Sequence, residues 1–222
     1  VGILGTTGAG KSTIINLLCR FFDVTDGEVL VDGINVKDLD LYELRENIGI
    51  AMQDVFLFSD TIEGNIAYGR PNCSFEEVKQ AAIMADANHF IQALPDGYDT
   101  IVGERGVGLS GGQKQRISLA RALLKDPSIL ILDDTTSAVD METESYIQSQ
   151  LKKLDNKCTI FVIAYRISSI RDADLILVMD NGRIIEQGTH EQLVAAGGYY
   201  ATAFHNQYGE IPQEILNGKG EK

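Results

Sequence analysis

Short apolar runs alternate along the chain with stretches in which apolar residues recur every three or four positions. A run of four or five apolar residues between turn residues predicts a buried strand, and the wider spacing predicts an amphipathic helix. Strands that alternate with helices are typical of an α/β fold with a mainly parallel sheet. The predicted strands are Val1–Leu4, Gly27–Gly33 with a hairpin return at Ile34–Val36, Ile48–Ala51, Ile129–Leu132, Thr159–Ile163, Leu175–Met179 and Arg183–Glu186.

Helical spacing is clearest after the first strand, over Lys11–Phe22. The buried side of that helix would carry Ile14, Ile15, Leu17, Leu18 and Phe21. Ser74 and Glu77 form the S-x-x-E pattern of a capping box, which predicts a helix start. The further predicted helices are Ser74 to about Ala85, Asp86–Leu94, Ser110–Lys125 and Met141–Leu154.

The strand signals stop between residues 61 and 127, which predicts a helical insertion in an α/β core. We therefore assign residues 1–60 and 128–208 to the core and residues 61–127 to an α-helical subdomain. The polar residues 209–222 are predicted to form a disordered tail.

Composition narrows the class of protein. The 222 residues carry a formal charge of −13, which argues against a nucleic-acid surface and against docking on anionic lipid. The sequence has no signal peptide and no run of about 18 apolar residues, so we expect no direct membrane insertion. The three cysteines, Cys19, Cys73 and Cys158, are too scattered for a disulfide framework or a zinc site and favour a reducing, cytosolic setting.

Residues 5–12 read GTTGAGKS and fit the phosphate-binding P-loop pattern G-x-x-x-x-G-K-[ST]. A strand precedes them and a helix follows, so backbone N–H groups and a helix N-terminus would point at a phosphate. Lys11 would reach the β- and γ-phosphates, and the Ser12 hydroxyl would hold Mg²⁺. A glycine-rich helix start would fit the pattern by chance in on the order of one in a hundred such chains. The predicted nucleotide contacts here are Gly5, Thr6, Thr7, Gly8, Ala9, Gly10, Lys11, Ser12 and Thr13.

The apolar strand that starts at Ile129 runs directly into an acid, Asp133. A buried parallel strand presents its C-terminal residue at the ligand crevice, where a carboxylate can bind Mg²⁺ or one of its waters. Acids often follow apolar strands, so the feature alone is weak. Together with a P-loop it is strong, because Mg-nucleotide chemistry needs such an acid.

Residues 109–113 read LSGGQ at the start of a predicted helix. In the simplest interpretation Ser110 and Gln113 form another capping box. Gly111 and Gly112 argue for more than capping, because each glycine inside a helix costs roughly 1 kcal/mol relative to alanine. They would leave the N–H groups of the helix terminus approachable, which predicts a second anion site at Ser110, Gly111, Gly112 and Gln113.

These three motifs resemble the nucleotide-binding domain of an ATP-binding cassette (ABC) protein. In order along residues 1 to about 208, Gln53 resembles the Q-loop glutamine, residues 103–106 (GERG) the X-loop of exporters, and Ser137–Asp140 the D-loop. Residues 56–66 also resemble the exporter sequence. The resemblance implies a P-loop NTPase with a RecA-like core and a head-to-tail dimer around ATP and Mg²⁺. It gives Gln53 a catalytic and Mg²⁺-binding role and Asp140 a nucleotide contact. Taken singly, Gln53 would be a turn residue, residues 103–106 a loop, and Asp140 a helix cap.

Two positions depart from the family pattern. The family follows the strand-end acid with a catalytic Glu, and here stands the shorter Asp134. Its switch histidine aligns with Tyr165, a phenol that donates a hydrogen bond but carries no positive charge near neutral pH. Both changes together resemble the degenerate half of a heterodimeric multidrug or lipid exporter. We expect His89, His190 and His205 to lie outside this site, with His190 at a helix start.

The leading hypothesis is therefore the ATPase domain of an ABC exporter at the cytoplasmic face of the plasma (inner) membrane. It would pair with a non-identical domain that carries the consensus Glu and His, and contact transmembrane domains through Gln53–Ile66 and Gly103–Gly106. We also expect a further N-terminal portion, with the adenine-stacking aromatic, upstream of Val1. Two alternatives remain. A soluble DNA-repair or chromosome-organising ATPase would carry coiled coils between Lys11 and Leu109, and a non-hydrolysing ATP sensor would fit Asp134 and Tyr165.

Overall fold

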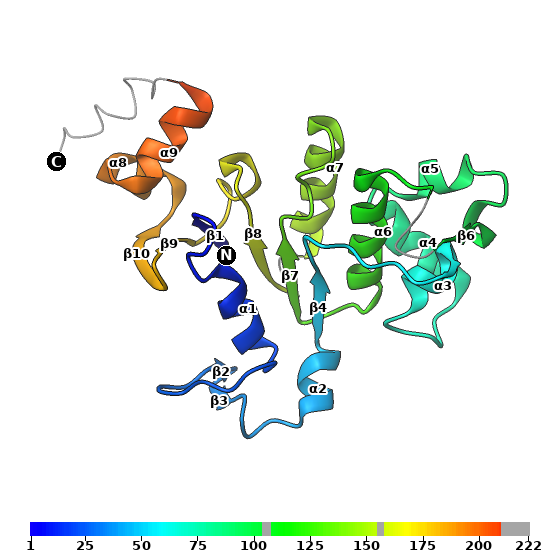
Figure 1. Cartoon of the computed structure of the whole chain (residues 1–222), viewed down its shortest axis with the longest axis horizontal. Coiled ribbons are helices and arrows are strands. Elements are labelled where there is room, and N and C mark those ends of the chain that lie inside the picture. The colour runs from blue at the N-terminus through cyan, green and yellow to red at the C-terminus, as the bar shows by residue number, and fades with distance from the viewer. Residues whose placement is uncertain (104–107, 155–157, 210–222) are drawn as a thin grey trace. The chain divides into compact units, whose positions relative to one another are not determined.

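The computed structural model describes residues 1–103, 108–154 and 158–209, and the chain folds into two compact units. Unit 1 consists of Val1–Ile14 and Phe161–Lys222, and unit 2 of Ile15–Ile160. Helix α1 (Lys11–Leu18) and strand β8 (Thr159–Ile163) each carry the chain from one unit into the other (Figure 1). The expected tail lies outside the described residues, except for Gly209.

Strand β1 (Gly2–Gly5) lies at the centre of the sheet in unit 1 and is fully buried. It pairs in parallel with β8 and with β9 (Ile176–Asp180), and β10 (Arg183–Gly188) pairs antiparallel to β9. Gly2 is needed for packing here, because a Cβ at this position would lie 2.7 Å from the Cβ of Ile170. The predicted mainly parallel sheet is therefore confirmed.

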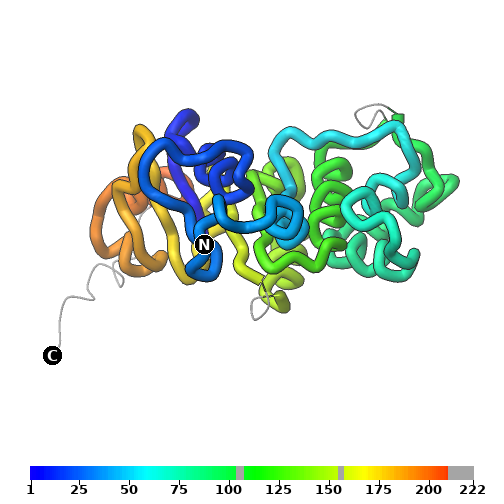
Figure 2. Tube along the Cα trace, turned by 90° about the horizontal axis from the view of Figure 1, so that it is seen from below, coloured from blue at the N-terminus to red at the C-terminus, as the bar shows by residue number. Residues whose placement is uncertain are grey.

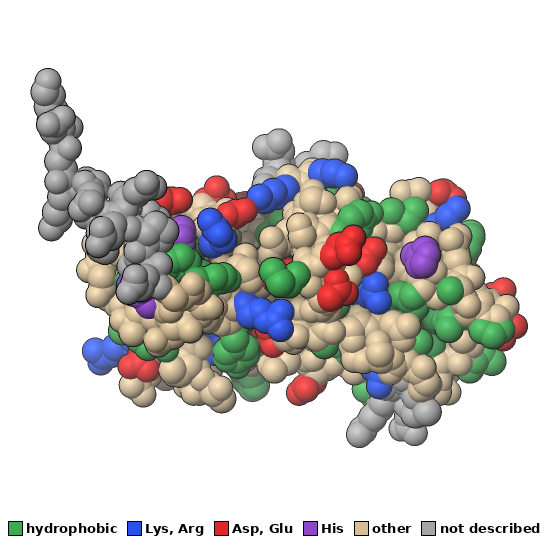
Figure 3. All heavy atoms as spheres, turned by 90° about the horizontal axis from the view of Figure 1, so that it is seen from above, with side chains coloured by type: hydrophobic (Ala, Val, Ile, Leu, Met, Phe, Trp, Pro, Cys, Tyr) green, Lys and Arg blue, Asp and Glu red, His purple; other side chains and the backbone are tan. Residues whose placement is uncertain are grey.

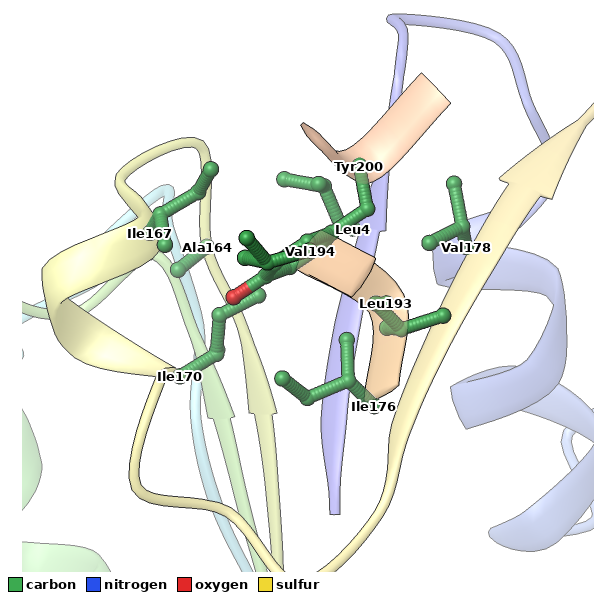
Figure 4. Close-up of a cluster of buried hydrophobic side chains, with 9 residues drawn as sticks. All are labelled: Leu4, Ala164, Ile167, Ile170, Ile176, Val178, Leu193, Val194 and Tyr200. Atoms are coloured by element: carbon green, nitrogen blue, oxygen red, sulfur yellow. The ribbon is translucent and has the colours of Figure 1, made fainter. Parts of the chain in front are cut away.

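Two helices at the end of the described chain pack on this sheet, α8 (His190–Ala196) and α9 (Tyr199–Tyr208). Figure 4 shows Tyr200, Val194 and Leu193 from these helices meeting Ile176 and Val178 of β9. The His190 Nδ1 atom lies 2.8 Å from the Tyr200 hydroxyl, and both side chains are buried. His190 begins α8, as predicted, and fills a packing role; helix α9 was not predicted.

Unit 2 contains the parallel pair of β4 (Ile48–Ala51) and β7 (Ile129–Asp133), which are aligned so that Ala51 faces Leu132. The predicted hairpin is present but short, with β2 at Leu30–Val31 and β3 at Ile34–Asn35. Helix α2 (Leu41–Glu46) precedes β4, and α7 (Met141–Leu151) follows β7. The ends of β4 and β7 therefore lie side by side, which brings together the residues that follow them.

The segment between β4 and β7 is mainly helical, as the sequence predicts. Figures 1 and 2 show α3 (Ile62–Ala67), α4 (Phe75–Met84), α5 (Asn88–Gln92) and α6 (Gly111–Leu124) gathered together. Ser74 caps α4 with the predicted capping box. Helix α6 buries a continuous face that includes Ile117, Leu119 and Leu123, and this face anchors the helices around it.

Three local expectations need correction. Helix α1 ends at Leu18 rather than Phe22, because Arg20 adopts the left-handed conformation with φ +50°. Phe21 is consequently 47% exposed, with the Arg45 guanidinium 5.0 Å from its ring centre. Two residues of strand, β6 (Ile101–Val102), pair with β5 (Asp60–Thr61) where no strand was expected. So short a pair carries too little alternation to be recognised.

Candidate nucleotide-binding site

The loop between β1 and α1 has the backbone that a phosphate cradle requires. Gly8 and Gly10 have φ values of +83° and +97°, which glycine adopts without strain. At Gly5 a side chain would collide with the Met179 carbonyl. The loop closes with the Ala9 N–H donating to the Thr6 carbonyl over 3.1 Å. Its N–H groups and the start of α1 can together bind an anion.

Lys11 is buried at the first position of α1, with 6% of its side chain exposed. Its Nζ donates to the carbonyls of Gly5 and Thr6, each over 2.8 Å. The Tyr165 ring, which follows β8, has its centre 4.8 Å from the same Nζ. An ammonium has three donors, so two are engaged by the loop and the ring faces the charge. Ser12 and Thr13 are exposed, as ligand-binding hydroxyls must be.

A residue that the sequence did not indicate holds the backbone around Tyr165. Gln207, in the last turn of α9, donates from Nε2 to the Tyr165 carbonyl over 2.8 Å. Its Oε1 accepts from the Ile167 N–H over 2.9 Å. The side-chain amide thus spans the peptide on either side of residue 166. All of these residues belong to unit 1.

In unit 2 the predicted acids and Gln53 lie at or just after the adjacent ends of β7 and β4. Asp133 ends β7, and Gln53 follows the end of β4 by two residues. Gln53 is exposed and Asp133 is half-buried. Asp134 adopts φ +48°, so the chain turns sharply right after the strand. Within unit 2, the side chains of Asp133 and Gln53 offer hard oxygen atoms of the kind that Mg²⁺ prefers.

The described residues contain no cluster of three or more His, Cys, Asp and Glu side chains that could hold a metal ion alone.

Residues 109–113 (LSGGQ), called the signature from here on, lead into α6, which starts with the predicted capping box. The Ser110 Oγ accepts from the Gln113 N–H over 3.2 Å, and the Gln113 side chain accepts from the Ser110 N–H over 2.9 Å. Gly112 has a packing reason as well, because a Cβ there would lie 2.8 Å from the Ala138 carbonyl. At Gly111 the nearest atom would be 3.7 Å away, so that position is open.

Gln115, also missed by sequence reasoning, ties α6 to the loop after β7. It is buried, and its Nε2 donates to the Ser137 Oγ over 3.2 Å and to the Asp134 carbonyl over 3.4 Å. Its Oε1 accepts from the Ala138 N–H over 3.1 Å. These hydrogen bonds therefore hold the start of α6 at a fixed position relative to the segment after β7.

Asp140 caps α7, as the simpler interpretation of that residue predicts. Its carboxylate accepts from the Thr143 N–H over 3.0 Å and the Glu142 N–H over 3.1 Å. These bonds, the one from Thr143 foremost, hold the pKa of the Asp140 carboxyl below its usual value. The Thr143 hydroxyl also lies 3.2 Å from Asp86 Oδ2, which pairs with Arg116 of α6 at 3.1 Å.

The predicted exporter surface is described only in part, because residues 104–106 of the 103–106 segment lie outside the described residues. Within the described part of the chain no helix is long and apolar enough to cross a bilayer. On the face drawn in Figure 3, Lys and Arg side chains lie interspersed with Asp and Glu. That face offers no broad basic patch of the kind that nucleic acids need.

The strand, glycine-rich turn and buried lysine of unit 1 define a P-loop nucleotide-binding protein. Residues 1–137 match the family model described as ABC transporter. The chain therefore belongs to the ABC transporter family, whose ATP-binding domains are ATPases coupled to transport.

The relatives are bacterial transporter proteins. The "Uncharacterized ABC transporter ATP-binding protein YknU" of Bacillus subtilis (strain 168) is 54% identical over 95% of this chain and 36% of the relative. The "Putative multidrug export ATP-binding/permease protein YgaD" of the same strain is 52% identical over 92% of this chain and 35% of the relative. The chain thus spans about a third of the length of the relatives it matches.

A solved structure of a bacterial Atm1-family ABC exporter with ATP bound superposes with a TM-score of 0.91. It is 47% identical in sequence, over 95% of this chain and 37% of that one. The chain is accordingly an ATP-binding domain of the ABC transporter family, and it is similar to the corresponding parts of a putative multidrug export protein and of an Atm1-family exporter. The α/β fold predicted from the sequence is confirmed.

Proposed function

We propose that this exporter domain hydrolyses ATP slowly at its own P-loop and completes a productive site on a non-identical partner. The observation that carries the proposal is an asymmetry between two helix starts. At α1 the Tyr165 ring faces Lys11. The family's histidine at this position has an imidazole, which can carry a positive charge, and the phenol cannot. At α6 the signature is complete and capped.

The domain's own site would hold ATP through the loop N–H groups and the Lys11 ammonium, with Gly5 to Thr13 around the phosphates. Mg²⁺, held by Ser12, Asp133 and Gln53, would supply charge neutralisation of the phosphate oxygens. Asp134 would accept the proton of the attacking water and Gln53 would orient that water. The shorter Asp134 side chain would place its carboxylate too far away, which weakens general-base catalysis.

The signature would act on the partner's ATP. Ser110, Gly111, Gly112 and Gln113 form a helix start that can face a γ-phosphate, where hydroxyl and N–H donors stabilise developing negative charge. Asp140 would lie near the same nucleotide, through the segment that Gln115 holds against α6. The partner would supply the consensus Glu and His, so that site would turn over faster.

Transmembrane domains would contact the surface around Gln53–Ile66. It presents exposed aromatic rings: Phe56 is 50% exposed, and Phe58 stacks on Tyr68 with ring centres 4.2 Å apart. Arg121 of α6 reaches the Phe56 and Asn65 carbonyls over 3.0 and 2.7 Å. Residues 103–106, of which only Gly103 is described, are the second proposed contact for these domains.

A cavity of about 240 Å³ is lined by Phe21, Arg45 and Arg121, and Arg121 also faces the Phe58 and Tyr68 rings. An exposed aromatic group next to a hollow suits a docked helix. The domain would then lie at the cytoplasmic face of the membrane.

Steady-state ATPase activity of the assembled transporter tests the proposal. Ser110→Arg should abolish most activity while sparing ATP binding at this chain's own P-loop, and Asp134→Asn should reduce total turnover only slightly. If Asp134→Asn is the more damaging change, the chain works as a slow homodimer and the heterodimer proposal fails.

A non-hydrolysing ATP sensor is the second candidate, favoured by Asp134 and Tyr165. It would show no single-turnover hydrolysis at this chain's site, whereas the proposal expects slow hydrolysis. A soluble DNA-repair ATPase is disfavoured because Lys11 and Leu109 are only 98 positions apart and the interval contains no heptads.

A further inference from the structure

The end of helix α9 reaches the segment that carries Tyr165. The Gln207 side chain is the link: it donates to the Tyr165 carbonyl and accepts from the Ile167 N–H. Gln207 lies 42 positions from Tyr165 in the sequence, so this is a tertiary contact. A side-chain amide is the group that can donate at one end and accept at the other, and here it uses both.

Helix α9, which carries Gln207, is anchored to the rest of unit 1. Tyr200 is fully buried, with its hydroxyl beside His190. The Glu186 carboxylate of β10 accepts from the N–H groups of Tyr199 and Tyr200, which fixes the start of the helix. The Gln207 amide is therefore presented from a docked helix rather than from a free chain end.

The other side of Tyr165 faces the P-loop. Its ring lies over the Lys11 ammonium, which is buried and held by the Gly5 and Thr6 carbonyls. A cation facing an aromatic ring in a partly desolvated site is attracted to it, and the attraction falls off when the ring moves away. The position of the ring thus depends on the backbone at residue 165, which Gln207 holds.

We propose that Gln207 is a positioning residue of the nucleotide site: it fixes the Tyr165 backbone so that the ring holds the Lys11 ammonium in place for the phosphates. The inference rests on the proposed role of Lys11 in ATP binding. The hydrogen bonds of the Gln207 side chain go to the backbone of Tyr165 and Ile167, so we expect its effect on affinity to pass through the Tyr165 ring.

A double-mutant cycle in the intact protein that contains this chain tests the inference. The affinity for a non-hydrolysable ATP analogue with Mg²⁺ is measured by calorimetry for Gln207→Met, which keeps side-chain length but has no amide. We expect the dissociation constant to rise about threefold or more. The matched control is Asn206→Met, the same change of type one position earlier on the exposed side of α9.

Combining Gln207→Met with substitutions of Tyr165 separates a positioning role of Gln207 from a purely stabilising one. In a Tyr165→Ala chain, which has no ring, Gln207→Met should change the dissociation constant by less than about 1.5-fold. In a Tyr165→Phe chain, which keeps the ring, the effect of Gln207→Met should persist. Should Gln207→Met lower the thermal midpoint sharply, Gln207→Asn serves instead, since its amide is one methylene too short to span both partners.

Two results would overturn the inference: an effect of Gln207→Met no larger than that of Asn206→Met, or an equal effect with and without the Tyr165 ring. Lys11→Ala is measured in the same series. If Lys11→Ala leaves affinity unchanged, the proposed function fails at its first step, and that outcome is distinguishable from a failure confined to Gln207.

Discussion

The two glycine-rich helix starts, at α1 and at α6, differ in what their glycines do. In the P-loop, Gly8 and Gly10 provide positive φ angles that curl the chain around a ligand. At α6, Gly112 instead allows close contact with the Ala138 carbonyl, and the first turn is closed by the Ser110 and Gln113 side chains. The first helix start is therefore shaped for a ligand, and the second is shaped equally by its own neighbours.

This difference shows that similar glycine patterns can have different structural causes, a backbone conformation in one case and close packing in the other. A phosphate cradle needs free N–H groups, whereas the proposed role of α6 toward a partner's nucleotide would need a fixed orientation. Gln115 and the Asp86–Arg116 pair hold the start of α6 against its neighbours. At α1 the corresponding support comes from the Gly5 and Thr6 carbonyls and the Tyr165 ring.

The largest expected effect would sharpen the comparison by testing hydrolysis of the ATP that this chain's own P-loop is proposed to bind. Asp134→Glu combined with Tyr165→His should accelerate hydrolysis at this chain's own site by roughly 10²- to 10⁴-fold, the usual contribution of a positioned general base. Single-turnover hydrolysis measures it. An unchanged rate would mean that these two residues do not limit the site.

The second-largest expected effect is a loss of stability when Gly112 at the start of α6 is substituted, and Gly111 provides the matched control. Gly112→Ala places a methyl group 2.8 Å from the Ala138 carbonyl, and such overpacking costs roughly 1–3 kcal/mol. Gly111→Ala meets nothing closer than 3.7 Å and should be tolerated. Urea unfolding of the two variants compares them. Equal stabilities would contradict the packing role of Gly112.

Lys11→Ala probes the ligand role of the α1 side. Removing the charged contact to the β- and γ-phosphates should weaken MgATP affinity at least tenfold, or about 1.4 kcal/mol. Calorimetry on the intact protein measures it. Because Lys11 also bonds the loop carbonyls, a thermal melt of the variant without nucleotide separates lost binding from a disturbed loop.

The sequence predicts what is local and contiguous. The P-loop occupies eight consecutive residues, and the capping boxes at Ser74 and Ser110 each span four, so their patterns are complete within one turn. The end of β7 at Asp133 follows from an uninterrupted apolar run.

The supporting contacts were not predictable in the same way. Gln207 bonds to a residue 42 positions away, and Gln115 to residues 19 to 23 positions away. Neither contact produces a periodic pattern, because a single polar side chain on a helix has the same appearance whether it faces water or a distant carbonyl. Helix α9 was missed for a related reason, since only its residues Tyr200 and Ala201 are fully buried, and Ala203 and Phe204 are partly buried.

The smallest expected effect tests whether the polar network around α6 stabilises the fold. The Thr143 hydroxyl is buried and lies within hydrogen-bond distance of Asp140 and Asp86, at 3.0 and 3.2 Å. Thr143→Val should lower the free energy of unfolding by about 1 kcal/mol, the usual net value of one hydrogen bond. Thr202→Val is the control, because the exposed Thr202 hydroxyl bonds only the Gly198 carbonyl of the preceding turn.

The pH dependence of the stability difference between the native chain and Thr143→Val gives a second check. The bonds from Thr143 lower the pKa of the Asp140 carboxyl in the folded state. A carboxyl whose pKa is lowered by folding stabilises the protein above its unfolded pKa, and this contribution is lost as the pH falls through the folded value. The stability gap between the native chain and Thr143→Val should therefore be complete at pH 7 and shrink below about pH 4. Urea unfolding at both pH values measures it, and a gap that stays constant would show that Thr143 acts by packing rather than through Asp140.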